Sequence, residues 1–362
     1  MHANYYNPVR SVAGAGTLAD LASLTGGRRT VLVTFPEARE LGLVARIEKL
    51  LGPSLVQVID RVLPNPDVAE LRPMYEAFWR EHEDTEVLLA VGGGSAIDTA
   101  KALMVGTESG RFDDLLALLA SGQSFVPPRH KTLIAVPTTA GTGSEVTPWA
   151  TIWDRASQRK YSLHLPETWP TCAVVDAELM LSAPPAVTLA SGLDALSHAL
   201  EAVWNVNANP ISDAFAVSAA QDILQVLPAL MRAPGDIALR EAMSLAALKA
   251  GMAFSNTKTA LAHSISYEMT LRHGLPHGIA CSFPLPLVCR LALYKSPARD
   301  AVLRKIFGQD LQQAPEKLTA FLHGLGVKTG FADYGVSEEE AQRMVAHAMQ
   351  GVRGKNFIGA IA

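Results

Sequence analysis

The chain is poor in cysteine and in charged residues. Its 362 residues include three cysteines, Cys172, Cys281 and Cys289, an odd number without C-x-x-C spacing. Such a set forms neither a disulfide framework nor a zinc cluster on its own. Charged residues make up 18% of the chain and the net charge is −4. This balance gives no electrostatic reason to expect nucleic acid or an anionic membrane as a partner.

Long apolar segments are also missing from the sequence. The N-terminal stretch MHANYYNPVR lacks the apolar core of a signal peptide. No apolar run approaches the roughly 18 residues of a membrane span. Hydrophobic residues still make up 49% of the chain, which is enough for a sizeable core. We therefore expect a cytoplasmic protein that acts on a small molecule and has no nucleic-acid or membrane partner.

The first half of the chain alternates short apolar runs with helical patterns. Four such runs predict buried strands within residues 30–34, 86–95, 132–139 and 172–176. Strands that alternate with helices favour a mostly parallel sheet that is covered on both faces.

Helical periodicity dominates the second half of the chain. After APPAV (183–187), long stretches rich in alanine and leucine carry apolar residues at helical spacing. The length also favours two domains. The sequence thus predicts an α/β dinucleotide-binding domain over residues 1–183 and an all-helical domain over residues 184–362.

Two glycine-containing patterns compete for a phosphate. In VGGGSAIDTAKAL (91–103), the glycines let the backbone approach a ligand, and Ser95 can cap the next helix, whose free N–H groups attract a pyrophosphate. The alternative is a glycine-rich turn that binds nothing. The other pattern, GAGTLA (14–19), follows RSVA, a poor strand, so we interpret it as an ordinary turn into a helix.

A second loop supports a nucleotide site in the first domain. The third predicted strand ends in PTTAGTGSEVTPWA (137–150), which is rich in glycine and small hydroxyl side chains. Ligands of open α/β sheets gather at the carboxyl ends of the strands. Two such loops after two strands indicate a nucleotide more strongly than either loop alone.

An acid and an imidazole stand four residues apart in SGLDALSHALEAVW (191–204). At helical spacing Asp194 and His198 lie on one side of the helix, together with Ser197 and Glu201, opposite an apolar stripe. Taken alone, this pattern is also compatible with a solvated helix face.

Three further histidines change this interpretation. His263, His273 and His277 fall within fifteen residues, from only 10 histidines in the chain. A helical domain can receive inward-facing ligands from separate helices. One carboxylate with several imidazoles suits a divalent transition metal such as Fe(II) or Zn(II). The sequence therefore favours a metal site in the helical domain.

These stretches together resemble the iron-containing (group III) alcohol dehydrogenases. The resemblance runs over essentially the whole chain and depends on GGGSAIDTAK, PTTAGTGSE, DAELMLSAPPAVTLASGLDALSHALEA and HGLPHG, in this order. It implies the dehydroquinate synthase-like fold of that family, with an α/β nucleotide-binding domain and an all-helical metal-binding domain. It also implies hydride transfer from a nicotinamide coenzyme to a carbonyl group.

The resemblance assigns roles to particular residues. The implied ligands of Fe(II) or Zn(II) are Asp194, His198, His263 and His277. His273 matches a position near the metal that often holds a histidine, so it is the implied catalytic proton relay. The implied cofactor-binding residues are Asn65, Gly93, Gly94, Ser95, Asp98, Thr138, Thr139, Gly141, Thr142 and Lys160.

The sequence departs from the family pattern at two places. Phe35 stands where many members have an aspartate that binds the adenosine ribose, and Arg39 follows four residues later. Without the carboxylate a 2′-phosphate is not repelled, so NAD(P)H is the expected coenzyme, with NADPH slightly favoured. Tyr267 stands where many members have a histidine, four residues after His263. The surroundings of the metal are therefore expected to differ.

The segment SNTKTALAHSISYEMTLRHG points to an anionic substrate. Lys258 lies between two threonines and five residues before His263. It can bind an anionic group, or it can be an ordinary surface lysine. The stretches KYSL, WNVNANPISDA and NTKTALAHSISY resemble the phosphonoacetaldehyde reductase branch of the family. That branch reduces phosphonoacetaldehyde to 2-hydroxyethylphosphonate.

Other functions remain open from the sequence. Maleylacetate reductase and general primary alcohol dehydrogenase are the alternatives within the family. A dehydroquinate synthase-like lyase would be expected to present a Glu-His-His metal set. A non-catalytic nucleotide-binding relative should have lost a ligand or a glycine, and neither is missing. Homodimers are common in the family, so a homodimer is expected.

Overall fold

The computed structural model describes residues 3–360, which form two compact units. One comprises Pro8–Thr139 and Ser144–Ser182, and it is an α/β unit. The other contains residues 183–360 with two short segments, 3–7 and 140–143, and it has helices but no named strand among the described residues. The predicted order of an α/β part followed by an all-helical part is confirmed.

A six-stranded parallel sheet forms the centre of the α/β unit. Its strands, in spatial order, are β1 (Arg10–Ala13), β10 (Cys172–Val175), β7 (Thr132–Pro137), β4 (Val87–Gly92), β2 (Thr30–Thr34) and β3 (Leu55–Ile59). The four predicted strands are the four central ones. Their continuous apolar runs are typical of strands that are buried on both faces.

Neither edge strand was predicted from the sequence. Arg10–Ala13, whose RSVA reads as a poor strand, pairs in parallel with β10. Leu55–Ile59 pairs only with β2. These edge strands are partly exposed, so they lack the buried apolar run that identified the central strands.

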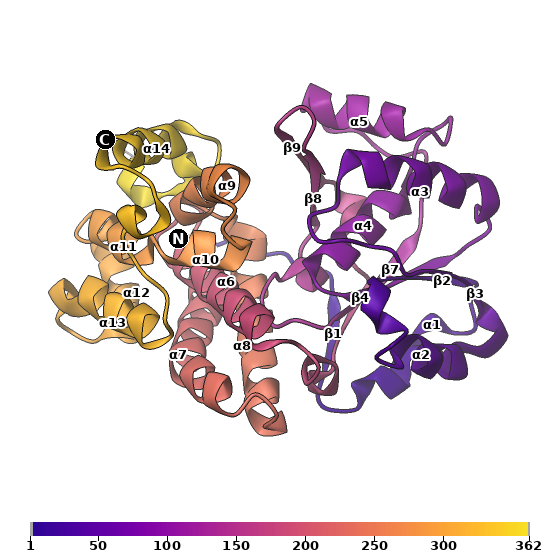
Figure 1. The fold of residues 1–362 in the computed structure, drawn as a ribbon, viewed down its shortest axis with the longest axis horizontal. Helices are drawn as coiled ribbons and strands as arrows, with labels where there is room; N and C mark the ends of the chain where they lie inside the picture. The colour runs from indigo at the N-terminus through magenta and orange to yellow at the C-terminus, as the bar shows by residue number, and fades with distance from the viewer. Residues whose placement is uncertain (1–2, 361–362) are drawn as a thin grey trace. The chain divides into compact units, whose positions relative to one another are not determined.

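Helices cover both faces of the sheet (Figure 1). On one face, apolar residues of the sheet pack with α3 (Val68–Glu81), α4 (Gly94–Met104) and α5 (Phe112–Ser121). On the other face they pack with α1 (Leu21–Thr25) and α2 (Leu43–Leu51). Two small two-stranded sheets complete the unit: β5 (Val105–Gly106) with β6 (Arg129–His130), and β8 (Trp149–Asp154) with β9 (Arg159–His164).

A buried lysine fastens the segment after β7 to helix α4. The Lys101 side chain is fully buried and burial lowers its pKa to about 8. Its Nζ donates hydrogen bonds to three backbone oxygens, those of Ser144 (2.6 Å), Thr147 (2.7 Å) and Trp149 (2.8 Å). One turn earlier, the Asp98 carboxylate accepts hydrogen bonds from Ser144 Oγ and Thr151 N, both at 2.9 Å. These contacts set the path of the chain between β7 and β8.

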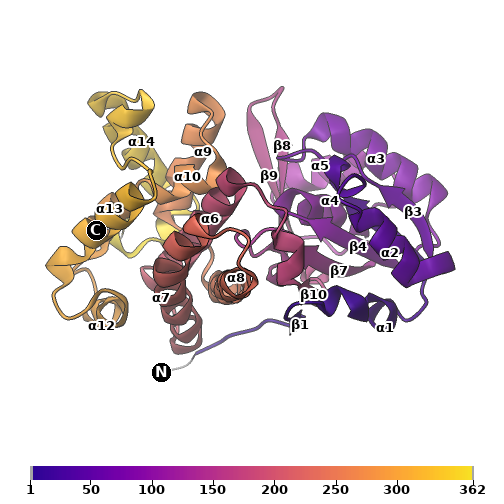
Figure 2. The same ribbon diagram turned by 60° about the horizontal axis from the view of Figure 1, so that its bottom comes forward.

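Nine α-helices, with short 3-10 turns, make up the described part of the helical unit. They are α6 (Pro185–Val203), α7 (Pro210–Arg232), α8 (Ile237–Thr257), α9 (Leu261–His273), α10 (His277–Ser282), α11 (Leu285–Ala292), α12 (Pro297–Phe307), α13 (Ala314–Gly324) and α14 (Glu338–Gln350). Helix α6 packs against α7 and α8 and also against α10 (Figure 2). This central place buries α6 almost all round.

Helix α7 is the one described helix with the length and hydropathy of a membrane span. Its 23 residues have a mean hydropathy of 1.4 over the most apolar window. The sequence analysis found no such run because Asp213 and Asp222 interrupt it. Ala216, Ile223 and other apolar residues of α7 belong to the core of the helical unit. We therefore interpret α7 as a core helix.

The Lys101 contacts lead to a stability prediction. In Lys101→Met, three backbone carbonyls lose their donor and the neighbouring Asp98 carboxylate loses a cation. We expect a loss of about 3–5 kcal/mol in the free energy of unfolding of the α/β unit. Urea unfolding followed by tryptophan fluorescence measures it. Lys49→Met, at an exposed position of α2, is the control. A loss below about 1 kcal/mol, as for a surface residue, would contradict this role.

Candidate active site

Helix α6 carries Asp194 and His198 into the interior. Their relative exposures are 3% and 5%, and every residue from Gly192 to Val203 is buried. The alternative of a solvated helix face is therefore wrong. His198 Nε2 lies 3.8 Å from Asp194 Oδ1. Burial lowers the pKa of His198 to about 4 although Asp194 acts in the opposite direction, so the imidazole is neutral at pH 7 and can bind a metal.

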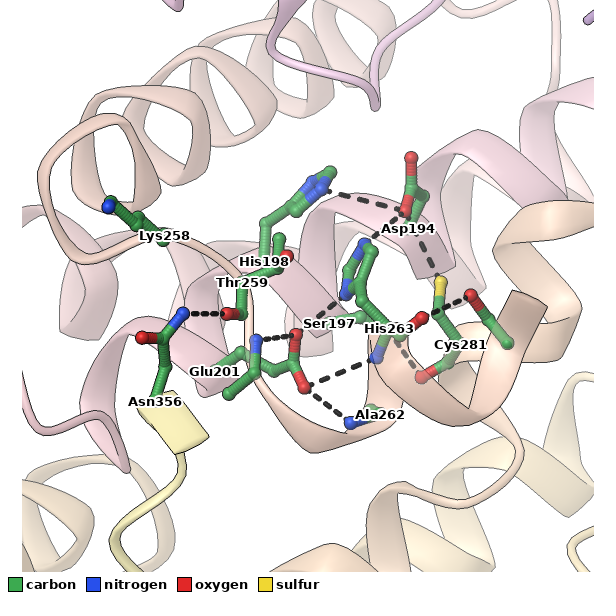
Figure 3. A network of polar contacts seen from close by, with 12 residues as sticks. Asp194, Ser197, His198, Glu201, Lys258, Thr259, Ala262, His263, Cys281 and Asn356 are labelled. Atoms are coloured by element: carbon green, nitrogen blue, oxygen red, sulfur yellow. Dashed lines mark hydrogen bonds and ion pairs between the residues drawn. The ribbon is translucent and has the colours of Figure 1, made fainter. Parts of the chain in front are cut away.

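Helices α9 and α10 bring two more imidazoles to the same carboxylate oxygen. His263 Nε2 lies 3.3 Å and His277 Nε2 lies 3.8 Å from Asp194 Oδ1. The His198 and His263 rings stack with centroids 4.6 Å apart (Figure 3). Three separate helices thus converge on one oxygen. The four side chains predicted as metal ligands lie together in the structure.

Glu201 orients one of these imidazoles. It lies one turn after His198 on α6 and is fully buried. Its Oε2 accepts a hydrogen bond from His263 Nδ1 at 2.7 Å and another from Ala260 N at 2.8 Å, while Oε1 accepts one from Ala262 N at 2.5 Å (Figure 3). Because Nδ1 carries the proton toward Glu201, the lone pair of Nε2 faces Asp194.

The sequence analysis missed the role of Glu201. The helical pattern placed it on the polar side of the helix beside His198, but that side was also open to interpretation as solvated. Only the helical spacing could have indicated a role for Glu201, because it places Asp194, His198 and Glu201 on one side of the helix. Its partner His263 comes from a helix that is remote in sequence, so no local pattern could pair them.

The donor set fits a divalent transition metal. His263 Nε2 is buried without a hydrogen-bond partner among the described residues, although it faces a carboxylate oxygen. Burial alone would lower the pKa of His263, but the Glu201 and Asp194 carboxylates together raise it. Burial would also raise the pKa of Asp194, but the histidines, His198 first, lower it. The pocket therefore attracts positive charge, and its nitrogen and oxygen donors suit Fe(II) or Zn(II).

A cysteine also reaches this pocket. Cys281 is fully buried on α10, and the single proton of its thiol faces two acceptors, Asp194 Oδ1 at 3.3 Å from Sγ and Gly278 O at 3.5 Å. Ligand-capable atoms of Asp194, His263, His277 and Cys281 all lie within 4.8 Å of one another. Burial, and next the Asp194 carboxylate, raise the pKa of the thiol well above its usual value. It is therefore a hydrogen-bond donor to Asp194 in this arrangement.

The sequence analysis gave Cys281 no place in the metal site. The cysteines have neither C-x-x-C spacing nor an even number, the two patterns that would indicate a metal cluster or a disulfide framework. The signal that could have found it is the i, i+4 spacing from His277, which puts both side chains on one side of α10.

His273 and Lys258 lie outside this group of ligand atoms. His273 is the last residue of α9, and its Nε2 lies 3.7 Å from Glu340 Oε1. Lys258 ends α8 at a φ of 66° with an exposed side chain. In Figure 3 its Nζ points away from Asp194. The catalytic role of His273 and the anion-binding role of Lys258 stay predictions.

The glycine-rich turn of the α/β unit leads from β4 into α4. Gly93 precedes the first helical residue, Gly94, so the first N–H groups of α4 are available to an anion. A Cβ at Gly92 would lie 2.7 Å from Ala96 Cβ, so the turn requires glycine there. The prediction that Ser95 caps the helix is wrong. Ser95 lies inside α4, and its Oγ accepts a hydrogen bond from Asn65 N at 3.0 Å.

The other predicted cofactor residues divide between the two units. Thr138 and Thr139 follow β7 beside the glycine turn, and Thr138 N donates to Gly92 O at 3.0 Å. Asp98 holds the β7–β8 connection, and Lys160 Nζ lies 5.3 Å from the centre of the Trp153 ring. The remaining two residues, Gly141 and Thr142, lie in the short segment 140–143, which belongs to the helical unit.

The backbone of Gly141 contacts His198, one of the predicted metal ligands. Its carbonyl oxygen lies 3.3 Å from His198 Nδ1. A Cβ at Gly141 would lie 2.5 Å from Ser191 O, so this close approach to α6 requires glycine. With a proton on Nδ1, His198 presents its Nε2 lone pair to Asp194. The predicted contact of Gly141 with the adenosine side of the coenzyme stays a prediction.

Comparison with known proteins identifies the class. Residues 8–177 match the family "Iron-containing alcohol dehydrogenase", and residues 188–360 match "Fe-containing alcohol dehydrogenase family, C-terminal". The chain belongs to the iron-containing alcohol dehydrogenase family. It is therefore an enzyme, an oxidoreductase of that family.

Its relatives act on several substrates. The chain is 32% identical to the NAD-dependent methanol dehydrogenase of Bacillus methanolicus, covering 96% of this chain and 94% of that protein. It is 31% identical to the lactaldehyde reductase of Escherichia coli (strain K12), covering 93% and 90%. The structure matches sulfoacetaldehyde reductase from Bifidobacterium kashiwanohense in complex with NAD+, with a TM-score of 0.90, 30% identity, and coverage of 99% and 94%.

The contacts of Glu201 lead to a prediction for metal binding. Glu201→Gln keeps the size of the side chain but removes the charge that fixes the His263 ring. We expect metal affinity to fall roughly 10- to 100-fold, measured by chelator competition and elemental analysis. Glu339→Gln, at an exposed position of α14, is the control. An unchanged affinity in a folded Glu201→Gln protein would show that Glu201 does not tune the site.

Proposed function

We propose that the enzyme is a metal-dependent NAD(P)H oxidoreductase that reduces a small anionic aldehyde to a primary alcohol. The best candidate reaction converts phosphonoacetaldehyde to 2-hydroxyethylphosphonate. The observation that carries the reaction class is the buried convergence of Asp194 with the three imidazoles of His198, His263 and His277, in a chain of the iron-containing alcohol dehydrogenase family.

The residues of the chain supply positioning and charge. When bound, Fe(II) or Zn(II) would polarise the substrate carbonyl for attack by hydride from the nicotinamide. Asp194 and the imidazoles would hold the metal, and Glu201 and Gly141 O keep two of the rings oriented. The N-terminus of α4 is proposed to bind the coenzyme pyrophosphate. A proton must reach the substrate oxygen, and His273 is the proposed relay.

The proposal of an anionic substrate has two supports. The stretches KYSL, WNVNANPISDA and NTKTALAHSISY resemble the phosphonoacetaldehyde reductase branch. A structural relative is a sulfoacetaldehyde reductase by name, and sulfoacetaldehyde also joins an aldehyde to a tetrahedral oxyanion. Maleylacetate is a competing anionic substrate. The names of other relatives, such as methanol dehydrogenase and 1,3-propanediol dehydrogenase, favour neutral alcohols as the second candidate.

The substrate class is tested by NAD(P)H oxidation. Fe(II)-loaded and chelator-stripped enzyme are offered phosphonoacetaldehyde, sulfoacetaldehyde, maleylacetate and butyraldehyde. We expect metal-dependent turnover, with kcat/KM for phosphonoacetaldehyde roughly tenfold or more above the others, because a site built for a polar group rejects analogues that lack it.

Each other outcome points elsewhere. Turnover of butyraldehyde alone would retain the metal-dependent reduction and reject the anionic substrate. A preference for maleylacetate or sulfoacetaldehyde would retain an anionic substrate but change its identity. No turnover with any metal would favour the lyase or the non-catalytic alternative.

We also propose that the enzyme accepts both coenzymes, with NADPH slightly favoured. Phe35 follows β2, and its ring lies beside the Gly92 turn, so no carboxylate stands there to repel a 2′-phosphate. Arg39 forms an ion pair with Asp60 that is largely open to solvent. Exposed ion pairs are weak, so Arg39 can exchange Asp60 for a phosphate at little cost.

Two variants test the coenzyme proposal. Arg39→Ala should raise KM for NADPH by roughly tenfold, the effect of a lost charge-assisted hydrogen bond, and leave KM for NADH nearly unchanged. Phe35→Asp should reverse the preference, because its carboxylate repels a 2′-phosphate. Steady-state kinetics with both coenzymes measure these effects. Equal changes for NADH and NADPH in both variants would argue against the proposed site.

Assembly and compartment remain proposals. We propose a homodimer in the cytoplasm that acts on a small molecule, without a nucleic-acid or membrane partner. The three cysteines are free and buried, which suits a reducing compartment. Light scattering on the purified protein measures the mass of the assembly.

A further inference from the structure

A cation lies beside the helix that carries His263. Arg353 follows α14, and its guanidinium carbon lies 4.8 Å from the centre of the Tyr267 ring. Tyr267 comes one turn after His263 on α9. The arginine therefore stacks on the helix face that continues from the metal pocket.

The Arg353 guanidinium has no acid or carbonyl partner. It makes no hydrogen bond or ion pair with the residues that the structure describes. By contrast, Arg240 donates to Pro234 O and Thr188 Oγ1, and Arg299 pairs with Asp213. Five N–H donors of Arg353 are therefore available to a ligand.

The environment of Arg353 favours an anion. Arg353 is half-buried, and this burial lowers its pKa to about 10 although the Glu201 carboxylate raises it, so the side chain is charged at pH 7. The Glu201 oxygens are already bonded to Ala260 N, Ala262 N and His263 Nδ1. The positive charge of Arg353 therefore has no acidic partner of its own among the described residues. A substrate anion would balance it.

The segment that carries Arg353 is fixed to α9. Asn356 Nδ2 donates to Thr259 O at 2.9 Å, and Ser264 Oγ donates to Ala348 O at 2.9 Å. Phe357 is fully buried in the core of the helical unit. These contacts hold the guanidinium in place before a ligand arrives, which reduces the entropy lost on binding.

We propose that Arg353 binds the tetrahedral oxyanion of the substrate and so selects aldehydes that carry a phosphonate or sulfonate. This assignment rests on the proposed reduction of an anionic aldehyde. The planar guanidinium can bond two oxygens of one tetrahedral group at once, which a lysine cannot do in the same way. Lys258 offers no such fork, and its Nζ points away from Asp194 (Figure 3).

Kinetics of three variants test this role. Arg353→Met should raise KM for phosphonoacetaldehyde roughly 10- to 100-fold, as expected for loss of a charged bidentate contact. KM for butyraldehyde and kcat with butyraldehyde should stay within about threefold, within the scatter of surface substitutions. Arg353→Lys should recover part of the loss. Arg343→Met, at an exposed position of α14, is the control and should leave both KM values nearly unchanged. Equal effects of Arg353→Met on the two aldehydes would overturn the proposal.

Direct binding separates this role from the choice of substrate. Methylphosphonate and methanesulfonate are titrated into the Fe(II)-loaded enzyme by calorimetry, without any turnover. We expect binding that Arg353→Met abolishes and that the exposed control Arg343→Met retains. The stronger of the two ligands indicates the anion that the site prefers. Binding that is lost in Lys258→Ala but kept in Arg353→Met would overturn the proposal. This readout holds even where phosphonoacetaldehyde is not reduced.

Discussion

The metal pocket depends on the buried ion pair between Glu201 and His263. A carboxylate without exposure is costly unless it is fully bonded. Glu201 meets this condition through Ala260 N, Ala262 N and His263 Nδ1, and although burial raises its pKa, these contacts lower it overall. Because the pair fixes both the start of α9 and the tautomer of His263, it sets the direction of the Nε2 lone pair. The remaining ligands converge on the same point from α6 and α10.

Close packing of helices makes this convergence possible. A Cβ at Gly278 would lie 1.8 Å from Ala190 O, so α10 approaches the backbone of α6 as only glycine allows. At Gly192 a Cβ would lie 2.7 Å from a Leu227 methyl group. The Gly278 contact brings His277 and Cys281 of α10 to Asp194, so the metal site depends on the close packing of the helices.

Much of this arrangement could be predicted from the sequence. The central strands were predicted because burial on both faces leaves a continuous apolar run. The spacing of Asp194 and His198 placed them on one side of a helix, and the resemblance to the family implied that they are metal ligands. Glu201 and Cys281 were missed because their partners come from other helices. Ser95 was misassigned as a cap. The sequence does not distinguish a serine whose Oγ accepts a hydrogen bond from its own helix from one whose Oγ accepts a hydrogen bond from a distant residue such as Asn65. Arg353 lies far from any recognised motif, and only the fold brings it to Tyr267.

Anomalous diffraction from crystals of the Fe(II)-loaded protein, recorded on both sides of the iron absorption edge, tests the central claim most directly. The account predicts one strong peak bonded to the Asp194 carboxylate and to Nε2 of His198, His263 and His277. Cys281 Sγ should lie outside bonding distance as a hydrogen-bond donor to Asp194. A peak bonded to Cys281 in place of His198, or no peak among these side chains, would contradict the account.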